Sequence, residues 1–165
     1  MSKIYTIGYE GTDIARFIDL LAATGVEVLA DVRAIPLSRK RGFSKRALAE
    51  HLSQAGIRYI HFKDLGDPKP GREAARAGKY DKFRRVYTGH LATTAAASAL
   101  RDLARLADAS TVCLMCFERD PIVCHRSMVA DRLSRNRRVL HLYVDPHVSS
   151  ALITRSSARQ GIAAA

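Results

Sequence analysis

Residues 111–126 read TVCLMCFERDPIVCHR, and this stretch decides the fold that we expect. Its apolar start is typical of a buried strand, and the charged residues and proline that follow predict a tight turn. A helical pattern then begins at Cys124. A strand, a turn and a helix N-terminus in this order are typical of α/β proteins, which bind ligands at this place.

The turn carries a dense set of reactive side chains. Two thiols, a carboxylate, an imidazole and a guanidinium are more than the packing of a strand against a helix requires. We therefore take this turn as the candidate functional site. Its candidate catalytic residues are Cys116, Glu118, Cys124 and His125.

Length and composition predict one domain. A chain of 165 residues with 47% hydrophobic content can bury one sizeable core. We expect a single domain over residues 1–148, followed by a flexible tail over residues 149–165, which is small, polar and rich in alanine.

The location that we expect is the cytoplasm, away from membranes. No apolar run approaches the ~18 residues of a membrane span, and residues 1–5 begin a strand rather than an export signal. The sequence has three cysteines, an odd number that fits reduced thiols better than a disulfide framework. The oligomeric state is left open.

Strand-like and helical segments alternate along the chain, which predicts a mostly parallel five-stranded sheet with helices on both faces. Four glycines and prolines between residues 66 and 71 predict irregular structure there. The expected strands are residues 4–7, 26–32, 57–62, 111–117 and 139–144, and the expected helices include 80–87, 92–107 and 124–136.

The carboxyl ends of parallel strands meet at one edge of a sheet, so the residues just after each strand converge in space. Most of these residues carry functional groups, which concentrates the chemistry at that edge. They are Tyr9, Glu10, Asp31, Arg33, His61, Asp64, Cys116, Glu118 and Asp145.

The formal net charge of +11 points to an anionic partner. Basic residues are concentrated in segments 33–46 and 69–85, and arginine guanidinium groups match phosphate oxygens well. A nucleic acid or a phosphorylated small molecule is the partner class that this favours. A general bias of the coding sequence toward arginine and alanine is the alternative explanation.

Several short motifs, in order and spacing over about residues 3–145, resemble the domain-of-unknown-function family 488. Tyr9 stands where that family commonly has histidine, and Gly66-Asp67 where it commonly has a second glycine. The resemblance implies an α/β fold with this motif set and no defined reaction. The motifs are residues 5–9, residues 31–39 followed by Phe43, residues 56–59, residues 65–66 and the block C-F-E…C-H-R of residues 116–126.

Two charged pairs allow both a structural and a functional interpretation. Asp31 and Arg33 can form an ion pair that fixes a loop, or Arg33 can hold an anion. Glu118 can pair with Arg126, or act as a general acid or base if burial raises its pKa. The candidate ligand-binding residues are Tyr9, Asp31, Arg33, Ser38, Arg39 and Arg126.

Cys113, Cys116, Cys124 and His125 together have the donor types of a four-ligand zinc site. Residues three apart on a strand point to opposite faces, so Cys113 is expected in the core, away from Cys116. We therefore expect no bound metal and no cofactor. Cys124 opens a helix beside His125, where a thiolate is favoured, so it is expected to react with iodoacetamide before the other thiols.

Two function classes remain. The first is an enzyme, such as a hydrolase, that acts on a phosphate-bearing ligand, a nucleotide or nucleic acid. The second is a nucleic-acid or nucleotide binding module with structural or redox-sensing cysteines. Thiol chemistry of the rhodanese or phosphatase kind is a lesser alternative, because neither Cys116 nor Cys124 is followed by an arginine about five residues on. No dinucleotide or P-loop motif is present.

The charge distribution predicts weak binding to duplex DNA with a steep dependence on salt. If about four phosphates are contacted, the slope of log affinity against log salt is expected to be about −3 to −4, because each contact releases counterions. Fluorescence anisotropy of a labelled duplex over a salt series measures this slope. A flat response to salt would contradict the prediction.

Overall fold

One parallel sheet forms the centre of the structure, a computed structural model that describes residues 2–145. Its strands lie in the order β3-β2-β4-β1-β5, and each neighbouring pair is parallel. The predicted five-stranded α/β fold is confirmed. The predicted tail over residues 149–165 lies outside the described residues. The strands are β1 (Ser2–Gly8), β2 (Val28–Asp31), β3 (Arg58–His61), β4 (Val112–Cys116) and β5 (Arg137–Leu142).

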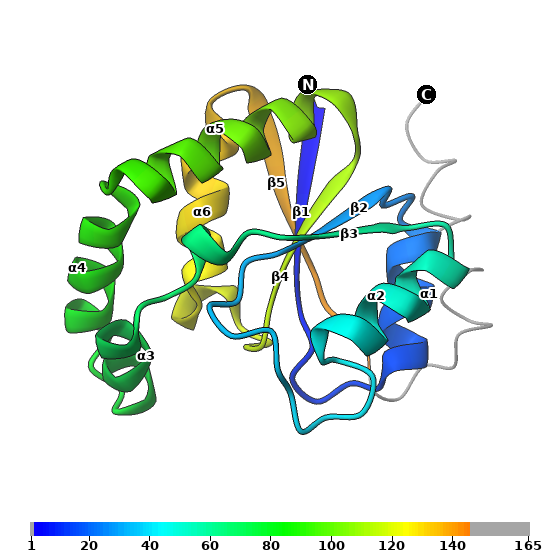
Figure 1. Ribbon diagram of the computed structural model, residues 1–165, viewed down its shortest axis with the longest axis horizontal. Helices are drawn as coiled ribbons and strands as arrows, with labels where there is room; N and C mark the ends of the chain where they lie inside the picture. Colours follow the sequence, from blue (N-terminus) through cyan, green and yellow to red (C-terminus); the bar gives the residue numbers. More distant parts are fainter. Residues whose placement is uncertain (1, 146–165) are drawn as a thin grey trace.

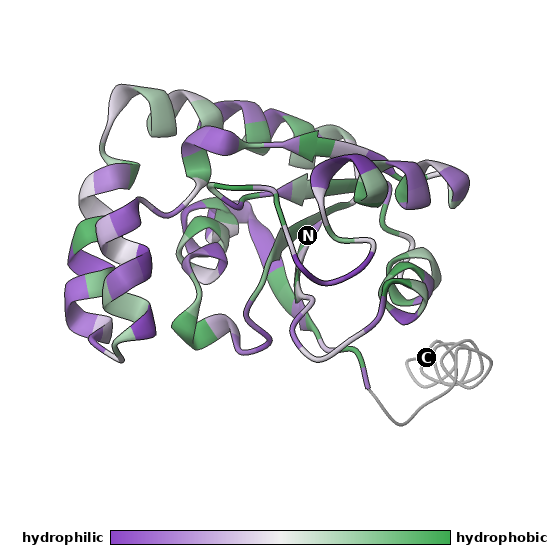
Figure 2. Ribbon diagram, turned by 60° about the horizontal axis from the view of Figure 1, so that its bottom comes forward, coloured by the Kyte–Doolittle hydropathy of each residue, from purple (hydrophilic) through white to green (hydrophobic). Residues whose placement is uncertain are grey.

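Helices cover both faces of the sheet (Figure 1). Helices α1 (Ile14–Ala23) and α2 (Lys45–Gln54) pack on one face. Helices α4 (Tyr80–Leu91), α5 (Thr94–Ala109) and α6 (His125–Leu133) pack on the other face. In Figure 2 the helices change between hydrophilic and hydrophobic colour along their length, as expected for amphipathic helices with one buried side. No helix in the described part of the chain is long and apolar enough to cross a membrane.

Strand β4 divides its side chains between the two cores. Val112, Leu114 and Cys116 belong to the core under α4, α5 and α6. Cys113 and Met115 belong to the core under α1 and α2. The alternation has the period of two that a strand imposes, so the prediction that Cys113 and Cys116 lie on opposite faces is confirmed.

The prediction of irregular structure around residues 66–71 is wrong in part, because helix α3 (Lys69–Arg76) begins there. Pro70 lies in the first turn, where a missing N–H does not break a helical hydrogen bond. Gly71 is also tolerated for a packing reason: a Cβ at this position would lie 2.0 Å from Asp67 Oδ1. The sequence pattern reveals neither that Pro70 lies in the first turn of a helix nor that Gly71 lies this close to Asp67.

Other helix boundaries differ by a few residues. Helix α4 continues past the predicted end at residue 87 to Leu91. Helix α5 begins at Thr94, because the hydroxyl oxygen of Thr93 accepts a hydrogen bond from the N–H of Ala96 at 3.3 Å. Helix α6 ends at Leu133, and the 3₁₀ turn Ser134–Asn136 follows it. Two further 3₁₀ turns are Lys63–Leu65 and Pro121–Val123.

A buried ion pair fixes the end of β2. The Asp31 side chain is fully buried and Arg33 is 5% exposed. Arg33 Nε donates to Asp31 Oδ1 at 2.9 Å, and Arg33 Nη2 donates to Oδ2 at 2.7 Å. The Tyr59 hydroxyl donates to the same carboxylate at 2.5 Å, which ties β3 to the pair. The structural interpretation of Asp31 and Arg33 is therefore the one that the geometry matches.

Replacing Asp31 by asparagine is expected to lower the free energy of unfolding by about 3–5 kcal/mol, because the Arg33 charge then stays buried without its carboxylate. The exposed pair of Asp102 and Arg105 on α5 provides the control. Asp102→Asn is expected to change stability by only about 0–1 kcal/mol. Urea unfolding followed by circular dichroism measures both. Similar losses for the two variants would contradict a structural role for Asp31.

Candidate functional site

A cavity of about 590 Å³ opens at the carboxyl edge of the sheet. The segments after β1, β2 and β4 form its walls together with α3 and the start of α6. The structure thus brings residues from distant parts of the sequence to the predicted edge. Six candidate residues line the cavity, namely Tyr9, Arg33, Cys116, Glu118, Cys124 and His125.

The other four candidates lie outside the cavity lining. Asp31 is held by Arg33 and Tyr59. Ser38 is part of a turn, in which its hydroxyl accepts a hydrogen bond from the Lys40 N–H at 3.1 Å. Arg39 is exposed on the same loop. Arg126 is fully buried behind the cavity wall. Only a ligand that extends past the cavity could reach Ser38 or Arg39.

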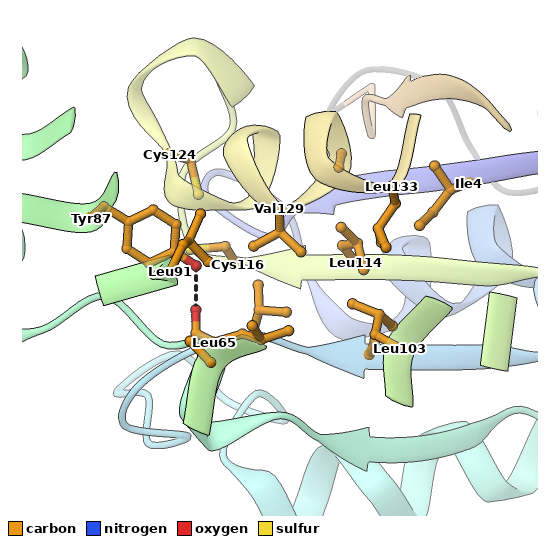
Figure 3. Close-up of a cluster of buried hydrophobic side chains, with 14 of the residues drawn as sticks. Ile4, Leu65, Tyr87, Leu91, Leu103, Leu114, Cys116, Cys124, Val129 and Leu133 are labelled. Carbon is orange, nitrogen blue, oxygen red and sulfur yellow. Dashed lines mark hydrogen bonds between the residues drawn. The ribbon is translucent and has the colours of Figure 1, made fainter. Parts of the chain in front are cut away.

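Two thiols and an imidazole meet where β4 ends and α6 begins. Cys116 is the last residue of β4, Cys124 is the N-cap of α6 and His125 is its first residue. Figure 3 shows Cys116 and Cys124 near each other beside Tyr87. His125 Nδ1 lies 3.6 Å from Cys116 Sγ and 3.9 Å from Cys124 Sγ. Within the described chain, the ligand atoms of these three residues form a group that could hold a metal ion.

The Nε2 atom of His125 lies 2.6 Å from the carbonyl oxygen of Val32. A carbonyl oxygen only accepts hydrogen bonds, so Nε2 carries the proton that it donates. In the neutral ring, Nδ1 then has a free lone pair directed at the two sulfur atoms. The end of β2 thereby sets the orientation of the imidazole in the site.

The two thiols differ in acidity. Burial raises the pKa of both thiols, and the nearby Cys124 raises the pKa of Cys116 further. At Cys124, the interaction with Cys116 and the charge of His125 outweigh burial and hold its pKa well below the ordinary value. Burial alone would lower the pKa of His125, but Cys124 raises it to about 9. Of the two thiols, Cys124 therefore loses its proton easily and Cys116 loses its proton with difficulty.

Glu118 lies beside the thiols, as predicted from its position two residues after Cys116. Cys116 Sγ donates to Glu118 Oε2 at 3.0 Å. Burial and the nearby Cys124 raise the pKa of Glu118 to about 7, although the hydrogen bond from Cys116 opposes this. A carboxyl group with a pKa near neutrality is able to take up and release protons.

Arg126 holds the loop between β4 and α6 rather than the carboxylate of Glu118. Its Nη1 donates to the carbonyl oxygen of Glu118, and its Nη2 donates to the carbonyl oxygen of Arg119 at 3.1 Å. Its Nε donates to Thr6 Oγ1 on β1 at 3.3 Å. Arg126 is thus a positioning residue, and the interpretation of Glu118 and Arg126 as a carboxylate–guanidinium pair does not match the geometry.

Sequence reasoning missed Asp67, which lines the cavity and is 4% exposed. Within the described chain, its Oδ1 atom is buried without a hydrogen-bond partner. Burial raises its pKa to about 6, against the lowering effects of His125 and Arg72. The departure from the family pattern at Gly66-Asp67 was the signal that could have identified it.

Helix α3 supplies two arginines that were also missed as site residues. Arg72 and Arg76 line the cavity and lie four residues apart, on one side of the helix. Arg72 Nη1 donates to the Asp67 carbonyl oxygen at 2.6 Å, while Arg76 is exposed. Both belong to the basic segment 69–85 noted in the sequence. Because irregular structure was expected there, the sequence did not predict that Arg72 and Arg76 lie on the same side of a helix.

Comparison with known proteins gives one match. The family model described as "Domain of unknown function DUF488" matches residues 13–133. The search of curated proteins and the search of solved structures found no match.

Replacing Gly8 by alanine is expected to displace the loop that carries Glu118. A Cβ at Gly8 would lie 1.8 Å from the Glu118 carbonyl oxygen, so the backbone must move. The expected loss of unfolding free energy is about 1–3 kcal/mol, with altered amide NMR shifts over residues 116–119. Gly89→Ala in α4 is the control, because no atom lies within 4 Å of the added carbon. It is expected to gain about 0.5–1 kcal/mol. Unchanged amide shifts in the Gly8 variant would contradict this tight approach.

Proposed function

The chain belongs to the family described as domain of unknown function DUF488, and we propose that it is an enzyme that acts on a phosphate-bearing ligand, a nucleotide or nucleic acid. The observation that supports this is a single cavity that combines a reactive cluster with two arginines. The reactive cluster is Cys116, Glu118, Cys124 and His125.

The arginines of α3 suit the phosphate. Arg72 and Arg76 line the same cavity as the reactive cluster. Guanidinium groups bind phosphate oxygens through charge-assisted, often paired hydrogen bonds. Arg33, in contrast, has its donors engaged with Asp31, Tyr9 and the Phe43 carbonyl oxygen. We therefore assign phosphate binding to α3 rather than to the loop after β2.

The rim of the cavity suits a planar base. Tyr80 and Phe117 line the cavity and are 38% and 45% exposed. Ile35 and Leu37 extend this apolar rim from the loop after β2. Aromatic side chains provide faces on which nucleobases stack, and such stacking tolerates any sequence. A phosphate between α3 and the reactive cluster, with its base at the rim, uses both features.

The reactive cluster supports catalysis. Glu118 can accept or donate a proton, and the two thiols and the imidazole are placed for nucleophilic or proton-transfer steps. The burial of Cys116 and Cys124, 4% and 1% exposed, favours the second candidate, a binding module whose cysteines are structural or redox-sensing. The two candidates share the ligand and differ in turnover.

Arg72→Ala and Arg76→Ala are each expected to weaken ligand binding by at least about tenfold, because a hydrogen bond to a charged group contributes about 1.5–3 kcal/mol. The probes are nucleoside mono-, di- and triphosphates and short single-stranded RNA and DNA, with binding measured by calorimetry. Arg101→Ala on α5, an exposed arginine outside the cavity lining, is the control.

Variants of the reactive cluster separate the two functions. Cys124→Ser and Glu118→Gln are expected to bind the probe that the wild type binds but to lose its conversion, followed by mass spectrometry of the products. Cys113→Ser, on the other face of the sheet, is expected to keep it. Binding without conversion by the wild type would favour the binding module, and equal losses in the Arg101 variant would refute the assigned phosphate site.

A further inference from the structure

The three residues at the junction of β4 and α6 offer one nitrogen and two sulfur donors. Cys116 comes from the end of β4, while Cys124 and His125 are adjacent at the start of α6. Their ligand atoms all lie within 4.8 Å of one another. From these atoms we propose that Cys116, Cys124 and His125 bind one transition-metal ion of the zinc type, with a fourth coordination position open to the cavity.

The two nitrogen–sulfur distances are close to those of a tetrahedral site. With zinc–sulfur bonds of about 2.3 Å and zinc–nitrogen bonds of about 2.0–2.1 Å, tetrahedral angles place ligand nitrogen and sulfur about 3.6 Å apart. His125 Nδ1 lies 3.6 Å from Cys116 Sγ and 3.9 Å from Cys124 Sγ. The two sulfur atoms also lie within 4.8 Å of each other.

The imidazole is oriented as in metal sites. Metal-bound histidines usually donate their other ring N–H to a carboxylate, a carbonyl oxygen or water, which fixes the tautomer. His125 Nε2 makes this contact with the Val32 carbonyl oxygen at 2.6 Å, and leaves Nδ1 for the metal. Cys124 Sγ does not form the side-chain hydrogen bond of a helix N-cap, so it is also available.

The surroundings favour an open site. Three protein ligands with a fourth position at a cavity are typical of catalytic zinc, whereas structural zinc has four protein ligands. All three ligands line the cavity, and Cys113 faces the other core. Glu118 lies beside Cys116 without belonging to the three-residue group. An oxygen atom of water or of a ligand in the cavity would complete the coordination.

This inference reverses the sequence-based expectation of no bound metal. That expectation depended on Cys113, which strand geometry separates from Cys116. The separation is confirmed, but the remaining three donors still converge, because Cys124 and His125 both point from α6 toward the end of β4. The metal site depends on this convergence and not on the identity of the ligand proposed above.

The test measures the metal directly, without a substrate. The full chain is purified and its zinc content determined by elemental analysis, with one equivalent expected. Zinc is then removed with a chelator and replaced by Co²⁺. Tetrahedral cobalt with thiolate ligands is expected to show strong visible bands and a near-ultraviolet sulfur-to-cobalt charge-transfer band.

Variants of the three cysteines provide the comparison. Cys124→Ser and Cys116→Ser are each expected to lower the charge-transfer intensity by about half. Each is also expected to weaken zinc binding by more than about 100-fold, which is more than the loss of a residue that only hydrogen-bonds to a ligand would cause. Cys113→Ser is the matched control and is expected to keep the stoichiometry and the spectrum. Glu118→Gln is expected to keep both as well.

The wild-type protein decides the outcome if a variant does not fold. Absence of zinc from the purified wild type, together with absence of the charge-transfer band after addition of Co²⁺, would overturn the inference. Rapid iodoacetamide labelling of Cys124 that zinc does not slow would also overturn it, and would indicate a free thiolate. Loss of the cobalt spectrum in the Cys113 or Glu118 variant would contradict the assigned ligands. The outcome of the nucleotide-binding experiments does not change the zinc content or the cobalt spectrum, so the two proposals are tested separately.

Discussion

The site depends on the buried guanidinium of Arg126. This side chain is fully buried, and its donors reach the carbonyl oxygens of Glu118 and Arg119 and the hydroxyl of Thr6. A buried charge is costly unless its hydrogen bonds are made, so the loop cannot leave these contacts cheaply. The loop in turn lies directly against Gly8, where a side chain would collide with it. Helix α6, strand β1 and the loop after β4 are thereby fixed to one another around the reactive cluster.

A second constraint is the period of two along β4. It sends Cys113 into the core under α1 and α2 and Cys116 toward α6. The placements of Cys113 and Cys116 follow from strand geometry and were predictable. Glu118 lies two residues past the end of β4 and was expected on the same side as Cys116; its carboxylate oxygen lies 3.0 Å from the sulfur. The parallel pairing of the strands and their common carboxyl edge were also predictable, because alternating strands and helices favour parallel pairing, whereas the order of the strands was not predicted.

The features that could not be predicted depend on packing between distant segments. Helix α3 begins among prolines and glycines, and Gly71 packs closely against Asp67, a contact that no local pattern reveals. The cavity wall formed by Arg72 and Arg76 was missed for the same reason. Arg33 was a candidate for holding an anion, since a sequence shows the charge of a guanidinium but not whether a neighbouring carboxylate already binds it. In the structure, the backbone and side-chain nitrogens of Arg33 donate four hydrogen bonds to the Asp31 carboxylate, so this guanidinium is already bound.

The electrostatics of the cavity connect its two proposed occupants. Cys116, Glu118 and Asp67 are acidic groups whose pKa is raised by burial, and His125 lies against both sulfur atoms of the cluster. Burial disfavours the charged forms of such acids, and like charges close together disfavour them further. The proposed divalent cation between the sulfurs would reverse both effects, because it would bind the deprotonated forms directly. Arg72 and Arg76 line the cavity from α3, so a phosphate group bound between them and the proposed cation would have positive charge on both sides. The proposed cation and the proposed phosphate group would therefore favour each other's binding.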